Sequence, residues 1–174
     1  GTQAIDLICR MLLEPGDTVL LDDPCYFNFQ ALLKAHRVKI ASVAYTPRGP
    51  DPVAFAEAVE TFRPRLYITN SGLHNPTGAT LSLQTAHRLL NAAAAHDMII
   101  IEDDIYGDFE PEPSPRLAAL DGLARVILIG SFSKTLAPSL RLGYVIAPPE
   151  LYPKLLQAKQ AADLHTPGFN QRVV

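Results

Sequence analysis

The sequence predicts an α/β fold, a three-layer αβα sandwich in which helices cover both faces of a mostly parallel sheet with one antiparallel strand. Three observations support this prediction. Short apolar stretches alternate along the chain with segments of helical periodicity. Several of these stretches are continuously apolar, as in strands that are buried on both faces. The last stretch follows its predecessor too closely for a helical crossover, so it is expected to run antiparallel.

The apolar stretches are the candidate strands. In chain order they are Thr18–Leu21, Val38–Val43, Leu66–Thr69, Met98–Ile101, Val126–Ile129 and Leu142–Ile146. Helical patterns fill most of the intervals, at Thr2–Leu13, Phe27–Ala35, Pro52–Phe62, Leu83–His96 and Pro149–Ala162. Asp51 before Pro52 is typical of an N-cap followed by proline at the first helical position, and Ser82 is a second candidate cap.

The final candidate strand also predicts where Arg141 lies. Only about a dozen residues, Pro138 among them, separate Ile129 from Leu142, and a helical crossover needs at least that length. If Leu142–Ile146 is antiparallel to its neighbours, Arg141 at its start lies at the same sheet edge as the carboxyl ends of the parallel strands.

Composition limits the class of protein. The chain has 174 residues, of which 48% are hydrophobic, and a net charge of −3. These values suit one domain with a substantial core and argue against a nucleic-acid surface. No apolar run reaches the ~20 residues of a membrane-spanning helix, and no segment resembles a signal peptide. Cys9 and Cys25 lack metal or redox spacing, so the expected location is cytoplasmic. The histidines form no HExxH or similar pair, and no role is predicted for His74.

Polar residues of different chemistry follow the candidate strands. Tyr26 stands in "DDPCY" after the first strand, and Asn75 in "NSGLHNPTG" after the third. Asp103 and Tyr106 stand in "EDDIYGD" after the fourth, and Lys134 in "GSFSK" after the fifth. Ligands of open α/β sheets bind beyond the carboxyl ends of the strands, where such loops meet. The sequence therefore predicts that these side chains converge on one site.

Taken together, these motifs resemble the large domain of pyridoxal-phosphate (PLP) enzymes of fold type I, the aspartate-aminotransferase-like superfamily. The matching segments are "GTQ" at a helix start, "NPTG", "DDIY" and "SFSKTLAPSLRLG", and they occur in the family's order. The resemblance covers essentially the whole chain and implies that residues 1–174 are a PLP-binding large domain. It also implies a fragment, which lacks the family's small domain and the N-terminal segment that crosses to a partner subunit.

The resemblance implies a role for each matching residue. Lys134 matches the Schiff-base lysine, which attacks the cofactor aldehyde and later moves protons; partial desolvation near a cation lowers a lysine pKa as this requires. Asp103 matches the carboxylate that keeps the pyridine nitrogen protonated, so that the ring accepts electrons from the substrate. Asn75 and Tyr106 match the donors to the cofactor's 3-oxygen, and Tyr26 matches the aromatic residue stacked on the ring.

The phosphate site that the resemblance implies combines a helix start with hydroxyl groups and an arginine. Free backbone N–H groups and the dipole of a helix favour an anion at its start. An arginine adds paired donors. The residues concerned are Gly1, Thr2, Gln3, Ser131, Ser133 and Arg141.

Simpler interpretations of the same residues stay open. Without their motifs, Tyr26 and Tyr106 are equally well explained as ordinary half-buried aromatic residues. The clustered carboxylates of "EDD" also suit a magnesium ion. Strand alternation argues against that site, because it turns Glu102 and Asp104 away from Asp103. The chain contains no GxGxxG dinucleotide motif and no P-loop.

The resemblance implies an aminotransferase, which transfers an amino group between an amino acid and a 2-oxo acid, its small-molecule partners. A close alternative comes from "YITNSGLHNPTG" and "DDPCYFNFQALL", which look like the PLP domain of MocR/GntR-type transcription factors. There the PLP domain senses a ligand and an N-terminal winged helix binds DNA. Such a regulator can keep every PLP-contacting residue, so the pocket does not decide between the two. The resemblance implies a homodimer for the full-length protein, and DNA contact only through a domain outside this chain.

Overall fold

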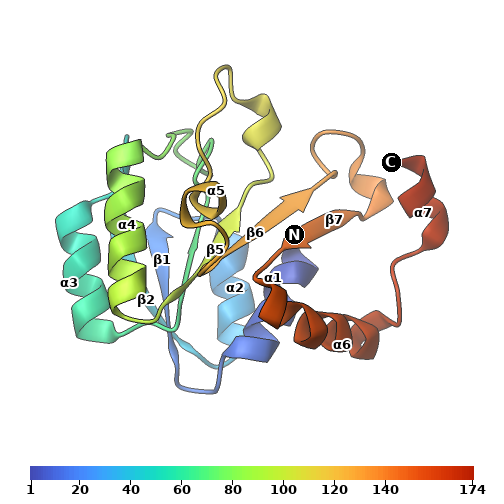
Figure 1. Ribbon diagram of the computed structural model, residues 1–174, viewed down its shortest axis with the longest axis horizontal. Coiled ribbons are helices and arrows are strands. Elements are labelled where there is room, and N and C mark those ends of the chain that lie inside the picture. Colours follow the sequence, from blue (N-terminus) through green and yellow to red (C-terminus); the bar gives the residue numbers. More distant parts are fainter.

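The computed structural model describes residues 1–174, and its central element is a seven-stranded sheet (Figure 1). The strands are β1 (Thr18–Asp23), β2 (Lys39–Thr46), β3 (Gly49–Pro50), β4 (Leu66–Thr69), β5 (Ile99–Asp103), β6 (Val126–Ser131) and β7 (Gly143–Ile146). Their order across the sheet is β3-β2-β1-β4-β5-β6-β7. The inner strands pair in parallel, whereas β3 and β7 run antiparallel to their neighbours at the two edges.

The predicted antiparallel strand is confirmed. In β7, Gly143 lies opposite Ser131 and Ile146 lies opposite Leu128, so the chain reverses direction after β6. The sequence analysis did not predict β3, because a strand of two residues carries no periodic pattern. The mostly parallel α/β class stands, with this second short antiparallel strand added at the other edge.

Helices cover both faces of the sheet. They are α1 (Thr2–Leu12), α2 (Phe27–Ala35), α3 (Pro52–Phe62), α4 (Leu83–Ala95), α5 (Leu117–Asp121), α6 (Tyr152–Asp163) and α7 (Gly168–Val173). Single 3-10 turns occur at Gly107–Phe109, Pro138–Leu140 and Pro149–Leu151. The short helices α5 and α7 were not predicted, and the predicted helix at Pro149–Ala162 is the last of these turns followed by α6. No helix combines the length and apolar character needed to cross a membrane.

Both predicted helix caps are confirmed. The side chain of Asp51 accepts hydrogen bonds from the backbone N–H groups of Val53 and Ala54, each at 2.9 Å. Ser82 accepts one from the N–H of Thr85 at 3.2 Å. These bonds satisfy N–H groups that have no partner inside the first turn of a helix, so they fix where α3 and α4 begin.

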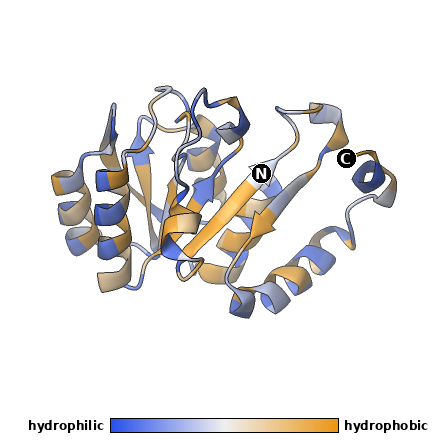
Figure 2. Cartoon of the chain, turned by 45° about the horizontal axis from the view of Figure 1, so that its top comes forward, coloured by the Kyte–Doolittle hydropathy of each residue, from blue (hydrophilic) through white to orange (hydrophobic).

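Two apolar cores, one on each face of the sheet, hold the three layers together. Along β1, Leu20 lies in the core that α3 and α4 cover, whereas Val19 and Leu21 lie in the core that α1 and α2 cover. Figure 2 shows the same arrangement, with apolar strands in the middle layer and helices that are polar on their outer sides. Burial on both faces explains why the strand sequences are continuously apolar.

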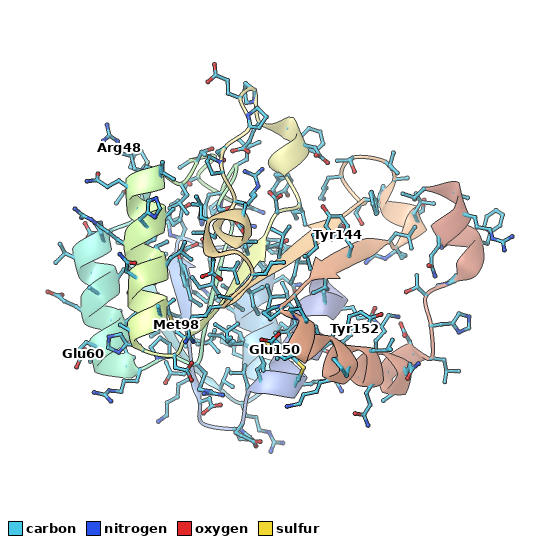
Figure 3. The ribbon with its side chains drawn as sticks, in the orientation of Figure 1. Arg48, Glu60, Met98, Tyr144, Glu150 and Tyr152 are labelled. Carbon is cyan, nitrogen blue, oxygen red and sulfur yellow. The ribbon has the colours of Figure 1, made fainter.

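The two sides of the molecule differ in how well their apolar residues are covered. Met98, next to α4, is fully buried, whereas Tyr144 of β7 and Tyr152 of α6 are 43% and 64% exposed (Figure 3). Other large apolar side chains of β7, α6 and α7 are also exposed, namely Val145, Ile146, Leu156, Phe169 and Val173. Most of the exposed large apolar side chains therefore lie between β7 and the end of α7, although Val53 and Phe62 of α3 and Leu83 of α4 are exposed as well.

Candidate functional site

Loops at the carboxyl ends of the parallel strands surround a cavity of about 280 Å³. It lies between the starts of α1 and α2 and the loops that follow β4, β5 and β6. Every predicted site residue except Gln3 lines it: Gly1, Thr2, Tyr26, Asn75, Asp103, Tyr106, Ser131, Ser133, Lys134 and Arg141. The structure thus brings together residues that are scattered over most of the sequence, at the sheet edge where ligands of such folds bind.

Asp103 is the last residue of β5 and its side chain lies against the cavity. It is 5% exposed, and its Oδ1 atom has no hydrogen-bond partner within the protein. Burial raises its pKa to about 6. Asn70 donates a hydrogen bond to its backbone oxygen at 2.8 Å, which holds the end of the strand in place. A buried carboxylate oxygen without a partner is costly, so this atom is suited to receive a donor from a ligand.

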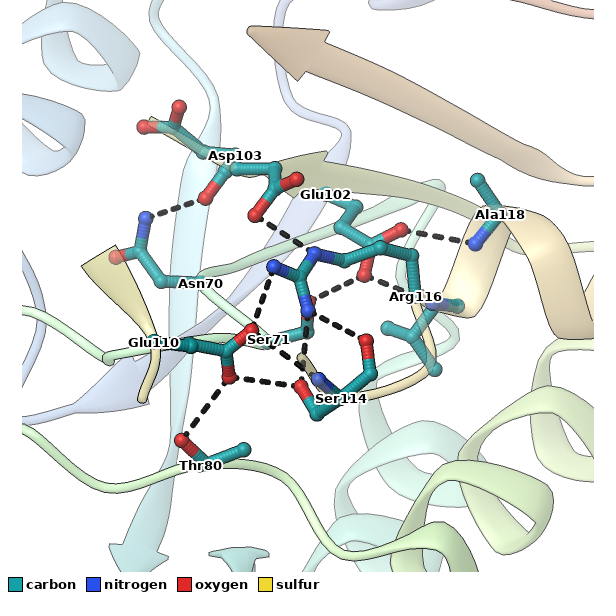
Figure 4. A network of polar contacts seen from close by, with 11 residues as sticks. Asn70, Ser71, Thr80, Glu102, Asp103, Glu110, Ser114, Arg116 and Ala118 are labelled. Atoms are coloured by element: carbon teal, nitrogen blue, oxygen red, sulfur yellow. Dashed lines mark hydrogen bonds and ion pairs between the residues drawn. The ribbon is translucent and has the colours of Figure 1, made fainter. Parts of the chain in front are cut away.

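The neighbouring carboxylates point elsewhere, as strand alternation predicts. Glu102 is fully buried on the opposite face, where it accepts hydrogen bonds from the N–H groups of Leu117 and Ala118, each at 2.8 Å, and from the Ser71 hydroxyl (Figure 4). These bonds attach the start of α5 to β5. The "EDD" carboxylates therefore do not converge, and no group of His, Cys, Asp or Glu side chains has the arrangement of a metal site.

Asp104 takes part in a separate network that shapes the loop after β5. Arg116 pairs with Asp104 at 2.8 Å and with Glu110 at 2.7 Å (Figure 4). Glu110 also accepts hydrogen bonds from the hydroxyls of Ser114 and Thr80. Thr80 belongs to the loop after β4, so this network joins the loops that carry Asn75 and Tyr106.

Lys134 lies in the loop after β6 and is exposed at the rim of the cavity. The resemblance implies a partly desolvated lysine, and this stays a prediction. In this structure the residue lies at the open side of the cavity, where a ligand that enters can reach its amine.

The residues predicted to bind phosphate lie where the start of α1 meets β6 and β7. Gly143 makes this approach possible, because a Cβ atom there would lie 2.7 Å from the backbone oxygen of Gly130 and 3.3 Å from the nitrogen of Gly1. The hydroxyl of Ser131 accepts a hydrogen bond from the N–H of Ser133 at 3.2 Å. The first N–H groups of α1, the two serines and Arg141 all line the same end of the cavity.

Arg141 reaches the cavity from an unusual backbone conformation. Its φ of 53° lies in the left-handed region, which non-glycine residues seldom occupy. Its Nη1 atom donates to the backbone oxygen of Pro138 at 3.2 Å, which steadies the 3-10 turn ahead of β7. The predicted position of Arg141, at the carboxyl-end edge of the parallel strands, is confirmed.

Two tyrosines and Asn75 complete the cavity wall. Tyr26 precedes α2 and makes edge-on contacts with the rings of Phe27 and Phe29, at centroid distances of 4.9 and 5.5 Å. Tyr106 precedes the 3-10 turn after β5. Both tyrosines are half-buried and both line the cavity. The predicted roles require both tyrosines to lie at the cavity, and they do. Ordinary packing residues would not need to lie there.

Gln3 is the exception among the predicted residues. Its side-chain amide donates to Asp163 of α6 at 2.7 Å, so it turns away from the candidate site. It lines an adjacent larger cavity of about 540 Å³ between α1, β7 and α6. Only its backbone, in the first turn of α1, remains near the predicted phosphate site.

Sequence reasoning missed several residues of the site. Asn28 lines the cavity from the first turn of α2, but it is only two residues from Tyr26, and helical spacing gave no signal for it. Asn70, directly after β4, holds the Asp103 backbone, and its place beyond a strand end was visible in the sequence. Ile5 and Leu32 add apolar walls that the sequence marks only as helix-core positions.

Comparison with known proteins agrees with this geometry. The sequence is 38% identical over 178 residues to the 2-aminoadipate transaminase of Thermus thermophilus, covering 99% of this chain and 45% of that protein. It is also 35% identical to the HTH-type transcriptional regulator TauR of Rhodobacter capsulatus, covering 97% of this chain and 34% of that protein. The chain thus spans less than half the length of these curated relatives.

The same similarity holds in three dimensions. The crystal structure of LysN, the α-aminoadipate aminotransferase of Thermus thermophilus complexed with N-(5'-phosphopyridoxyl)-L-leucine, superposes with a TM-score of 0.92 at 37% identity. The match covers 98% of this chain and 45% of that structure. The family described as aminotransferase class I and II matches residues 1–170. The chain therefore belongs to the class I and II aminotransferase family.

Proposed function

We propose that this chain is the PLP-binding large domain of an aminotransferase, which transfers an amino group between an amino acid and a 2-oxo acid. The observation that carries the proposal is the buried, unpartnered oxygen of Asp103, in the same cavity as the amine of Lys134. PLP presents a cationic ring nitrogen, which suits this carboxylate, and an aldehyde, which suits this amine.

The residues fit PLP at three points. The unpartnered Asp103 oxygen suits a protonated ring nitrogen. The start of α1, with Ser131, Ser133 and Arg141, suits a phosphate dianion. The exposed Lys134 suits an aldehyde. PLP, when bound, supplies a ring that withdraws electrons from the substrate carbon.

The protein's own residues then have distinct tasks. Asp103 holds a proton on the ring nitrogen, and with a pKa of about 6 it is mostly ionised at neutral pH. Asn75 and Tyr106 donate hydrogen bonds to the ring oxygen, and Tyr26 covers one face of the ring. Lys134 is the covalent anchor, and its amine takes up and returns the proton of the substrate carbon.

The chain spans 45% of the length of the Thermus aminotransferase, and we propose that residues 1–174 are the large domain of a longer cytoplasmic protein. A small domain and an N-terminal segment complete that protein, and the complete protein is a homodimer. The exposed apolar side chains around β7, α6 and α7 support this proposal, since such surface is normally covered by another domain or subunit.

Reduction of the PLP-loaded full-length protein with borohydride tests the proposal. We expect a visible absorption band before reduction and, after proteolysis, a phosphopyridoxyl group on the peptide that contains Lys134. Lys134→Ala should abolish the band and the label. Lys159→Ala is the matched control, because Lys159 lies on α6 and pairs with Asp163. A label on any other lysine, or a colourless protein, contradicts the assignment.

A second candidate function is a PLP-dependent transcriptional regulator, which the similarity to TauR over 97% of this chain favours. Because the domain is compatible with both functions, the test needs the whole protein. A screen of amino donors with the PLP-loaded full-length protein should give multiple turnovers for an aminotransferase. A protein that binds PLP, shows no turnover with any donor and shifts a DNA fragment from its own promoter is a regulator instead.

A further inference from the structure

A second buried polar cluster lies beside the candidate site, and the proposed roles leave it unused. Its centre is Asp22, which lies near the end of β1 and is only 2% exposed. The Tyr67 hydroxyl donates to its Oδ1 atom at 2.5 Å, and the Thr69 hydroxyl to its Oδ2 atom at 2.7 Å. The Nε2 atom of His74 lies 3.2 Å from Oδ2. Burial raises the pKa of Asp22, and the contacts with these three side chains oppose that rise.

His74 is held through its Nδ1 atom and through the face of its ring, whereas its Nε2 atom lies close to Asp22 without the geometry of a hydrogen bond. Its Nδ1 atom is 2.9 Å from the Thr77 hydroxyl, and its ring stacks on Tyr45 with a centroid distance of 3.6 Å and an interplanar angle of 15°. The Thr77 hydroxyl oxygen also accepts a hydrogen bond from the N–H of Ala79 at 3.3 Å, which ties the imidazole to the turn that follows it. When Asp22 is ionised it only accepts hydrogen bonds, so a proton on Nε2 is the compatible arrangement for this contact.

The cluster continues directly into the candidate site, because Asn75 follows His74 in the chain. Backbone bonds from Gly78 N–H to the His74 oxygen at 2.6 Å and from His74 N–H to the Ala79 oxygen at 2.8 Å close the turn. The side-chain bonds of the turn belong to His74 and Thr77, whereas the Asn75 amide lines the cavity. The direction of that amide therefore depends on how firmly residue 74 is held.

A buried carboxylate and imidazole are an expensive way to hold a turn. Desolvation of such a pair often exceeds its attraction, and apolar residues of similar volume pack at least as well. What the pair adds is a fixed direction, because hydrogen bonds and ring stacking allow the imidazole a single orientation. Functional groups of an active site need such support from residues behind them.

We propose that Asp22 and His74 form a positioning pair that orients the Asn75 amide toward the coenzyme oxygen. The pair acts through Asn75 and makes no contact with the coenzyme itself. This inference rests on the proposed function, in which Asn75 donates a hydrogen bond to that oxygen. Asp22 and His74 are both buried, neither lines the cavity, and the resemblance implies a role for neither of them.

The pH midpoint of the visible absorption band in the PLP-loaded full-length protein measures this role. Asn75 stabilises the deprotonated form of the chromophore, so a misdirected amide raises the midpoint. His74→Phe keeps the stack on Tyr45 and removes both nitrogens. We expect it to raise the midpoint by roughly one pH unit, as for the loss of a hydrogen bond to a charged oxygen. His74→Gln retains a donor for Asp22, so its midpoint should stay close to that of the wild type.

The decisive comparison repeats His74→Phe in an Asn75→Ala background. If His74 acts through Asn75, it has nothing left to position there, and the second substitution should not move the midpoint further. Leu89→Ala is the control for loss of stability alone, because Leu89 is fully buried in the core under α4 and does not line the cavity. It should leave the midpoint unchanged.

Several results would overturn the inference. One is a His74→Phe midpoint equal to that of the wild type or of Leu89→Ala, and another is a shift that persists without Asn75. If His74→Phe does not fold, Thr77→Val replaces it, since Thr77 is exposed and supplies the Nδ1 partner. We expect this variant to raise the midpoint by a smaller amount. An unchanged midpoint would contradict the proposed positioning pair. If the wild-type protein never develops the band, the proposed function itself fails. If the band forms but the variants do not shift its midpoint, only the positioning pair fails.

Discussion

Glu102 and Asp103 are neighbours on β5, and both are buried, yet their surroundings differ. Glu102 receives three hydrogen bonds, from Ser71 and from the first N–H groups of α5. Asp103, on the other face, has an oxygen without any partner. Burial raises the pKa of both carboxyls. One strand thus carries a carboxylate used to build the fold next to one left free for a ligand.

The difference teaches how a site can be recognised without its ligand. A native structure pairs nearly all of its buried polar groups, so an exception calls for an explanation. Where the exception faces a cavity, as for Asp103, a ligand is one partner that can explain it, and a protein can give up stability for such a function. Substitutions at the two carboxylates should therefore separate stability from activity.

The largest expected effect is that of Asp103→Asn on turnover. The variant keeps the shape of the side chain but loses the charge that, in the proposed function, holds a proton on the coenzyme nitrogen. If the full-length protein is the proposed aminotransferase, we expect its kcat to fall by about 10²–10³-fold, as when one preorganised electrostatic contact is removed. Asp108→Asn, at an exposed carboxylate of the next turn, should retain full turnover. Activity of Asp103→Asn within about threefold of the wild type would contradict the role.

The same substitution should affect stability in the opposite direction. Burial raises the Asp103 pKa from 3.8 to about 6, so the folded state binds this proton more tightly than the unfolded state. Its contribution to stability is therefore greatest below pH 4 and is lost as the pH rises toward 6. The coenzyme-free Asp103→Asn variant lacks this loss, and above pH 6 it should be more stable than the wild type by about 2–3 kcal/mol.

Urea unfolding of both coenzyme-free full-length proteins between pH 4 and pH 8 measures this difference. The wild-type minus variant free energy should fall with pH and level off above pH 6. A difference that stays constant across the range would show that the folded-state pKa of Asp103 is not raised.

Glu102→Gln is the converse case. The amide nitrogen of glutamine cannot accept a hydrogen bond, so an N–H at the start of α5 loses its partner. We expect the free energy of unfolding to fall by about 2 kcal/mol, while kcat per folded molecule stays close to the wild-type value. Chemical denaturation with Glu112→Gln, at an exposed carboxylate, as the control measures the loss. A variant that lost activity but not stability would reverse the comparison.

Ser71→Ala should have the smallest effect. It removes one of the three donors to Glu102 and leaves both backbone N–H groups in place. A loss of about 1 kcal/mol in unfolding free energy is expected, with Ser139→Ala at an exposed serine as the control. A loss as large as that of Glu102→Gln would mean that the hydroxyl, and not α5, is the main partner of Glu102.

The sequence was sufficient for features that follow local rules. Strand alternation separated Asp103 from Glu102, the spacing after β6 predicted an antiparallel β7, and position beyond a strand end placed Asn75 and Lys134 at one edge. The short elements β3 and α5 were missed, because they form only where tertiary hydrogen bonds hold them. The contact of Asp22 with His74 joins β1 to a distant loop, and no local pattern signals such a pair. The turning of Gln3 toward α6 depends likewise on a helix far along the chain.

Because Gly143 has no side chain, α1 can pack against β7, and this contact bears on the order in which the site forms during synthesis. Through this packing, the predicted anion-binding end of the cavity joins segments that lie far apart in the sequence. Arg141 and β7 follow β6, so a nascent polypeptide synthesised only as far as β6 has nothing at this edge of the sheet against which α1 can settle. The predicted phosphate site is therefore complete only after β7 has been translated and has paired with β6.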